Sequence, residues 1–134
     1  MSQTENLFIG QISRVQKTFT AEDVRKWSDL TQDDNPIYNE GIYFENPLVP
    51  GILCEALIFD AIRKEFANHI CCLVKKELLY LSPVHIGEKM TAEVETIEVN
   101  DERNWVTEKV TCMNATGKEV VIGQVVLQII ENTK

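Results

Sequence analysis

The middle of the chain carries one long helical pattern, and most of the chain after it alternates like β-strands. Over residues 51–66, "GILCEALIFDAIRKEF", apolar residues recur around most of the helix circumference, which predicts a largely buried helix. Four stretches with strand-like patterns come next, separated by turn-forming residues: 71–81, 88–99, 104–113 and 120–130. A single buried helix followed by an antiparallel meander predicts an α+β fold in which a curved sheet wraps the helix.

Local signals mark further elements on either side of the long helix. Residues 7–18 indicate an edge strand interrupted by a glycine. Thr20 followed by Asp23 is typical of a capping box, and the helix that it starts is expected to end near Gln32. The alternation within 88–99 slips phase toward its end, which indicates a β-bulge.

Length and charge narrow the classes of function. With 134 residues the chain is expected to form one domain around a single core. The formal net charge of −8 argues against nucleic-acid binding, because a phosphate backbone is bound through clustered Lys and Arg. The same charge argues against binding to anionic membranes, and no apolar run approaches the ~20 residues that span a bilayer. No signal peptide is visible at the start, so we expect a cytoplasmic protein.

The cysteines and histidines do not form a metal-binding motif. The four cysteines include no CxxC pair, and the chain has only two histidines, so we expect no metal site. The thiols are instead expected to be free in a reducing compartment.

An acidic turn precedes the long helix. In "TQDDNPIYNE", residues 31–40, two carboxylates run into Asn-Pro, which is a turn signal because proline disfavours a helical conformation in the residue before it. The helix downstream begins with free backbone N–H groups and the positive end of its dipole. Carboxylates near such a helix start are candidates for chemistry on a polar ligand.

These features, taken in order, resemble the MaoC-like, (R)-specific enoyl-CoA hydratase family of hot-dog proteins. The resemblance runs from about Phe19 to Ile130 and rests on "DDNPIY", on "NPLVPGIL" at the helix start and on "SPVHIGE" before a strand. It implies a hot-dog fold, with one long central helix wrapped by a curved antiparallel sheet, over residues 1–134. It also implies an enzyme that adds or removes water at trans-2-enoyl or 3-hydroxyacyl thioesters of CoA or acyl carrier protein, without another cofactor.

The resemblance assigns roles to individual residues. Asp33 matches the family's catalytic Asp, which acts on one water molecule, and Gly51 matches the glycine whose backbone N–H stabilises the thioester oxygen. Asn35 is the motif Asn, and Pro50 stands where the family often has His. Both are grouped with the substrate-binding residues, although the favoured role for Asn35 is to fix the loop by side-chain hydrogen bonds.

Tyr38 stands where the family has its catalytic His. An unperturbed phenol is only about 0.1% ionised at pH 7, so Tyr38 is a poor base there but can still donate a hydrogen bond. Loss of a well-matched acid–base group usually lowers a rate by ~10²–10⁴. We therefore expect a hydratase or dehydratase of low turnover in which Asp33, Tyr38 and Gly51 are the catalytic residues.

Two other functions stay open at this point. The His-to-Tyr change favours a non-catalytic subunit that binds an acyl thioester or supports an active paralogue. In other hot-dog proteins a helix acid drives thioester hydrolysis, so a thioesterase that uses Glu55 or Asp33 is the second alternative. Edge strands and an apolar, β-rich C-terminus predict a homodimer, with a heterodimer between paralogues as the alternative.

Overall fold

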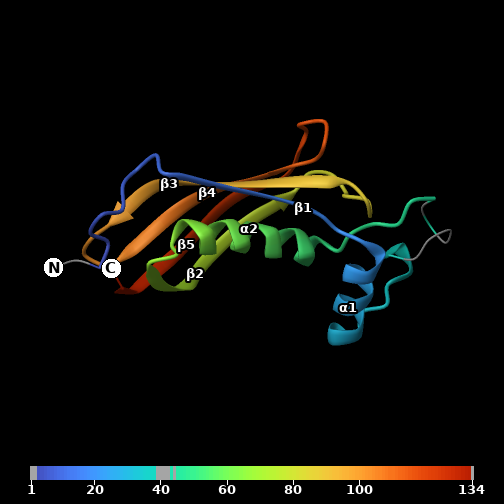
Figure 1. Cartoon of the computed structure of the whole chain (residues 1–134), viewed down its shortest axis with the longest axis horizontal. Helices are drawn as coiled ribbons and strands as arrows, with labels where there is room; N and C mark the ends of the chain where they lie inside the picture. Colours follow the sequence, from blue (N-terminus) through green and yellow to red (C-terminus); the bar gives the residue numbers. More distant parts are fainter. Residues whose placement is uncertain (1–2, 39–42, 44, 134) are drawn as a thin grey trace.

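The structure is a computed structural model that describes residues 3–38, 43 and 45–133. A five-stranded antiparallel sheet and two α-helices make up this part of the chain (Figure 1). In chain order the elements are β1 (Ile12–Thr18), α1 (Ala21–Thr31), the 3-10 turn Pro36–Tyr38, α2 (Gly51–Glu65), β2 (His69–Tyr80), β3 (Lys89–Asn100), β4 (Trp105–Met113) and β5 (Glu119–Asn132). The predicted long helix and the strands after it are all present, with ends shifted by a few residues at most.

The strand order in the sheet is β1-β3-β4-β5-β2. The predicted meander is correct for β3, β4 and β5, but β2 pairs with β5 and lies at the opposite edge from β1. Alternation in the sequence identifies which face of a strand is buried, but it does not identify the neighbouring strand. The expected edge strand over 7–18 is β1, which begins only at Ile12 because Gly10 takes a left-handed conformation with φ of +98°.

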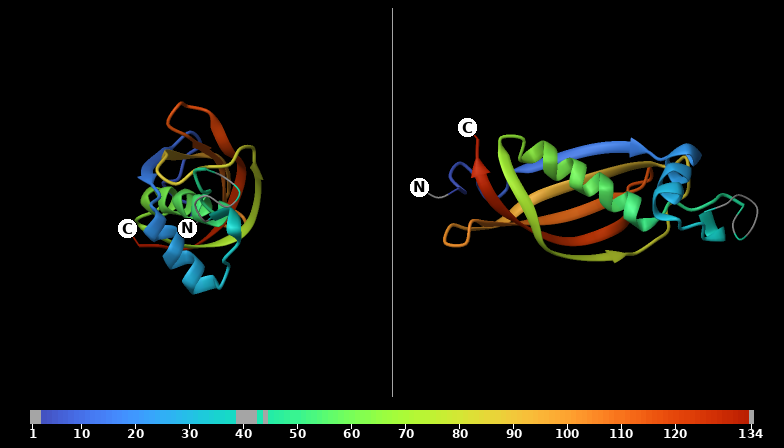
Figure 2. Two further views of the ribbon diagram at one scale, coloured as in Figure 1. Left: turned by 90° about the vertical axis from the view of Figure 1, so that its right-hand side faces the viewer. Right: turned by 90° about the horizontal axis from the view of Figure 1, so that it is seen from below.

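One side of α2 packs against the sheet, mainly against β1, β3 and β4. Figure 2 shows the sheet curving around this helix when the molecule is seen end-on. The core between them is aliphatic and includes Leu57, Ile58, Ala61 and Ile62 of α2 and Met90, Val94, Val106, Val110 and Val125 of the sheet. Full burial of one such Leu, Ile, Val or Met side chain contributes ~1.5–3 kcal/mol.

The opposite side of α2 is open. Ile52 is 60% exposed, Ala56 is also exposed, and Phe59 is only half-buried. The expectation that the helix would be largely buried is therefore wrong for this face. The sequence shows that a helix is apolar on several sides, but one sheet layer covers only one of them.

Local signals at α1 and in β3 are confirmed. The Thr20 Oγ1 accepts from the Asp23 N–H at 3.1 Å, while the Thr20 N–H donates to Asp23 Oδ2 at 2.9 Å, as in a capping box. The helix ends at Gln32, which caps it in a left-handed conformation and directs the chain into the acidic turn. The pairing of β3 with β4 shifts between Thr96 and Glu98, where the bulge was expected.

Two glutamates, one fully buried and one partly buried, lie together at the C-terminal end of α2. Glu108 of β4 is fully buried, and the Thr96 hydroxyl donates to its Oε2 at 2.7 Å and lies 3.3 Å from Oε2 of Glu65. The other oxygen of each carboxyl group is buried without any further partner among the described residues, so a proton shared between the two groups accounts for their contact. Burial, followed by the hydrogen bond with Glu65, raises the pKa of Glu108 to about 10.

This pair is expected to make stability fall as pH rises. A carboxyl group whose pKa is higher in the folded than in the unfolded state holds its proton more tightly when folded. The free energy of unfolding therefore falls as pH rises from its ordinary pKa of 4.5 to about 10. For one proton the limit is ~1.4 kcal/mol per pH unit. We expect Glu108→Gln to flatten this slope in urea unfolding curves between about pH 6 and pH 9.

Glu98→Gln on the same sheet is the matched control, because the Glu98 side chain is exposed to solvent. An unchanged slope in Glu108→Gln would show that Glu108 is ionised in the folded protein. Glu65 and Glu95 also raise the pKa of Glu108, so substitutions at these two positions measure how much each contributes to it.

Candidate active site

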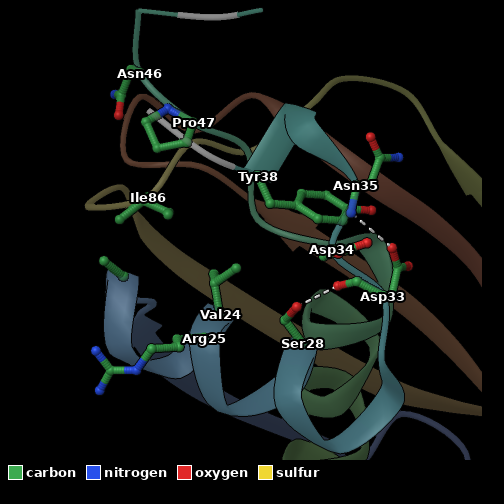
Figure 3. Close-up of a pocket in the computed structure, with 11 residues that line it drawn as sticks. Val24, Arg25, Ser28, Asp33, Asp34, Asn35, Tyr38, Asn46, Pro47 and Ile86 are labelled. Carbon is green, nitrogen blue, oxygen red and sulfur yellow. Dashed lines mark hydrogen bonds between the residues drawn. The ribbon is translucent and has the colours of Figure 1, made fainter. Parts of the chain in front are cut away.

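The acidic turn is held by its own backbone and side chains. The Asp33 Oδ1 accepts from the Asn35 N–H at 3.2 Å, and the Asn35 Oδ1 in turn accepts from the Ile37 N–H at 3.3 Å. The Ser28 hydroxyl of α1 donates to the Asp33 carbonyl (Figure 3). These contacts favour the loop-fixing role that was considered for Asn35. Within the described residues, the second side-chain oxygen of the half-buried Asp33 accepts no hydrogen bond.

Tyr38 packs between the turn and the first helix. Its ring packs against the Trp27 ring in a T-shaped contact, with ring centroids 5.6 Å apart and ring planes at 89° to each other. Partial burial, and then the negative charge of Asp33, raises the pKa of the Tyr38 hydroxyl. The phenol is therefore protonated at neutral pH and can donate a hydrogen bond.

A first cavity of about 430 Å³ opens beside this turn. Three residues predicted from the sequence line it together, namely Asp33, Asn35 and Tyr38 (Figure 3). The structure adds two groups of residues to which the sequence assigned no role: Ala21, Val24, Arg25 and Ser28 of α1, and Asp34, Asn46, Pro47 and Ile86 from within the quoted motifs. Arg25 and Ser28 are three residues apart on α1 and so share one face of the helix. This spacing is the signal in the sequence that could have placed them together.

A second cavity of about 480 Å³ lies at the start of α2. Gly51 is the first residue of this helix, so its N–H has no acceptor within the helix, and Pro50 before it provides no side-chain cap. The walls are mostly apolar and come from Ile37, Leu48, Val49, Ile52, Cys54, Leu81, Pro83, Val84 and Val121. Pro50 itself is fully buried and lines neither cavity, so its assignment to substrate binding stays a prediction.

Tyr38 is the residue that connects the two cavities. It lines both, whereas Asp33 lines only the first and Gly51 only the second. The predicted catalytic residues are thus brought to one region of the molecule, but the Asp33 carboxylate and the Gly51 amide do not share a wall.

The Gly51 cavity also contains a polar cluster. Glu55 of α2 accepts hydrogen bonds from the Lys76 ammonium and the Tyr80 hydroxyl, both of β2. The Tyr80 ring lies directly against Gly51, where a Cβ atom would come within 2.7 Å of Tyr80 Cε1. Tyr80 and Lys76 carried no signal in the sequence, because only the return of β2 beside α2 brings them to this helix.

Neither a metal centre nor a membrane span is present in the part of the chain that the structure describes. No group of three or more His, Cys, Asp or Glu side chains there is arranged to bind a metal ion. No helix within these residues is both long and apolar enough to cross a bilayer.

Comparison with known proteins places this chain in a family. The (R)-specific enoyl-CoA hydratase of Aeromonas caviae is 25% identical over 130 residues, which are 93% of this chain and 97% of that protein. The mitochondrial 3-hydroxyacyl-[acyl-carrier-protein] dehydratase FERN of Solanum lycopersicum is 32% identical over 133 residues, covering 92% of this chain and 78% of the relative. The solved structure of the A. caviae (R)-hydratase superposes with a TM-score of 0.86 at 26% identity, covering 92% of this chain and 98% of that chain. No protein-family model matches the chain.

The fold, the helix-start cavity and these relatives define a hydro-lyase of the hot-dog class. The chain belongs to the MaoC-like family of (R)-specific enoyl-CoA hydratases and 3-hydroxyacyl thioester dehydratases. The predicted family, the hot-dog fold and the hydratase or dehydratase type of activity are thereby confirmed. The roles of Asp33, Tyr38 and Gly51 stay predictions that the geometry makes testable.

Gly51 leaves room for the Tyr80 ring, which leads to a prediction. In Gly51→Ala the new Cβ would displace this ring while the backbone N–H remains. Because the ring is the flexible side of the contact and Ala favours a helix, we expect the free energy of unfolding to change by less than ~1 kcal/mol. Activity is expected to fall about tenfold or more, because the cavity wall moves beside the reacting carbonyl. Thermal unfolding and hydration rates measure the two effects, and a large loss of stability with normal activity would contradict this description.

Proposed function

We propose that this protein adds water to trans-2-enoyl thioesters and removes it from the corresponding 3-hydroxyacyl thioesters, with the acyl group carried on CoA or on acyl carrier protein. The named relatives include enzymes of both kinds, a CoA-thioester hydratase and an acyl-carrier-protein dehydratase. The carrier supplies the only non-protein group that the reaction needs. A cytoplasmic location remains part of this proposal.

The observation that carries the proposal is the uncapped start of α2 in the wall of an apolar cavity. The Gly51 N–H has no partner within its helix and lies at the positive end of the helix dipole. Hydration of an enoyl thioester places negative charge on the carbonyl oxygen as the enolate forms. A preorganised N–H donor at that oxygen stabilises the charge, and removal of such a donor typically costs ~10²–10³ in rate.

The acidic turn acts on the water molecule in this proposal. The free oxygen of Asp33 accepts one hydrogen bond from the water, and the protonated Tyr38 hydroxyl donates another where the two cavities meet. Tyr38 orients the water but exchanges protons poorly at neutral pH. The enzyme is therefore expected to be slow, since it lacks an imidazole at the position where its family has one.

The proposal predicts that Tyr38→His raises the rate of hydration. An imidazole titrates near neutral pH, so it can accept and return a proton where the phenol cannot. We expect kcat for a short trans-2-enoyl-CoA to rise about tenfold or more, measured by the loss of absorbance of the conjugated thioester. Asp33→Asn is expected to lower kcat about tenfold, because one acceptor for the water is lost.

Tyr38→Phe is the control, since it keeps the ring contact with Trp27 and removes only the hydroxyl. If Tyr38→His and the wild type are equally inactive, the hydratase proposal fails and the acyl-binding subunit is favoured. A thiol reagent detects any free CoA in the same samples. Release of free CoA would instead indicate that the protein is a thioesterase.

We propose in addition that the protein forms a homodimer through the open face of α2 and the edge strand β2. Among the described residues, β2 pairs with β5 on one side only. Its exposed apolar side chains include Leu73, Val74 and Leu79, and Ile52 of α2 is exposed as well. An unpaired, apolar edge beside an uncovered apolar helix face is a surface that favours association.

The dimer proposal predicts that Val74→Lys weakens association, because lysine on an edge strand opposes pairing of two edges. We expect the dissociation constant to rise about tenfold or more, which light scattering after size-exclusion chromatography would detect. Ile12→Lys on β1 is the matched control at the opposite edge, where the native side chain is exposed to a similar degree. Dissociation in Ile12→Lys but not in Val74→Lys would place the interface at β1 instead.

A further inference from the structure

The cavity at the start of α2 contains a carboxylate of its own. The Glu55 side chain is only 12% exposed, and it is the one acidic side chain among the described residues that line this cavity. Asp33, by contrast, lines the neighbouring cavity and is tied back to the Asn35 backbone. Any acyl thioester whose oxygen is bound by the Gly51 N–H therefore lies in the same cavity as Glu55.

The Glu55 carboxylate is held in place by β2. The Lys76 ammonium contacts Oε1, and the Tyr80 hydroxyl donates to Oε2. Partial burial, and then the hydrogen bond with Glu55, raises the pKa of Tyr80 well above its usual range, so this phenol remains a donor. The contacts with a positive charge and one donor hold the carboxylate in a fixed orientation, while each oxygen retains a second lone pair for a water molecule.

The spacing of Glu55 from Gly51 fits the substrate. Residues four apart on an α-helix lie above one another on the same face, with Cβ atoms about 5–6 Å apart. In an enoyl thioester the carbon that receives the water is three bonds from the carbonyl oxygen. An oxygen bound at the first residue of α2 thus brings the double bond toward the side chain one turn later.

We propose that Glu55 is the catalytic acid–base of this enzyme and that Lys76 and Tyr80 are its positioning residues. The inference rests on the proposed hydratase function. As the water oxygen bonds to C3, Glu55 accepts one proton from that water. The electron pair of the C2–C3 double bond moves toward the thioester, whose oxygen is stabilised by the Gly51 N–H. Glu55 then returns the proton to C2, so that one water molecule is added and the carboxylate is regenerated.

Replacement of Glu55 by its neutral isostere tests the proposal. We expect Glu55→Gln to lower kcat for a short trans-2-enoyl-CoA by ~10²–10⁴, with KM changed by less than about threefold. Asp60→Asn is the matched control, because Asp60 is a carboxylate of the same helix that lies outside this cavity and pairs with Arg63. Thermal unfolding of both variants shows whether the fold is kept.

Tyr80→Phe and Lys76→Met test the positioning roles. Each removes a group that favours the charged carboxylate, so the acidic limb of the kcat–pH profile is expected to move to higher pH. A purely structural contact would lower stability and leave this limb in place. We expect Lys76→Met to give the larger shift, because it removes a full positive charge.

The outcomes separate this inference from the proposed function. If the wild type hydrates the thioester and Glu55→Gln retains kcat within about threefold while Asp33→Asn abolishes it, the role of Glu55 is overturned and the hydratase stands. Absence of hydration and dehydration in the wild type overturns the proposed function, and the role of Glu55 falls with it. A loss in Glu55→Gln but not in Asp60→Asn, with a shifted pH profile in Lys76→Met, supports the proposal.

Discussion

One-sided burial of α2 is the constraint on which the rest of the structure depends. The sheet curves around this helix and covers the side that carries Leu57, Ile58, Ala61 and Ile62. Because that contact holds the helix at a fixed position on the sheet, its first residue faces a cavity bounded by the acidic turn, the end of β2 and the loop after it. A backbone donor at the end of a buried helix is rigid, which is the property that stabilisation of a developing charge requires.

The same helix brings different chemistry to its two ends. At its N-terminus, which has no side-chain cap, Gly51 and Glu55 line a cavity where polar groups can act on a ligand. At its C-terminus, Glu65 meets Glu108 in the core, where two acids are tolerated only with a shared proton. A carboxyl group at the N-terminal end of α2 can therefore act on a ligand, whereas one at the C-terminal end lowers stability. The two ends differ in whether the carboxyl group has access to water and to a cation.

Tyr38 explains how a family site can change without loss of the fold. Its ring packs on Trp27 and lines both the cavity of Asp33 and that of Gly51, so the aromatic side chain has a structural place of its own. What the substitution removes is a group that titrates near neutral pH. The chain retains the turn, the helix glycine and the apolar cavity, and Glu55 provides a carboxyl group on the wall where the thioester is proposed to bind.

The sequence by itself determined the long helix, the strand alternation, the bulge in β3, the capping box and the family, because these depend on periodicity and on short-range contacts. It also identified Asp33, Tyr38 and Gly51 as a set. Only the tertiary structure decided that β2 returns beside β5 and α2, that half of α2 stays uncovered, and that Lys76 and Tyr80 reach Glu55. The physical reason is that pairing between distant strands depends on the packing of the whole chain, and no local pattern specifies which edge a strand will join.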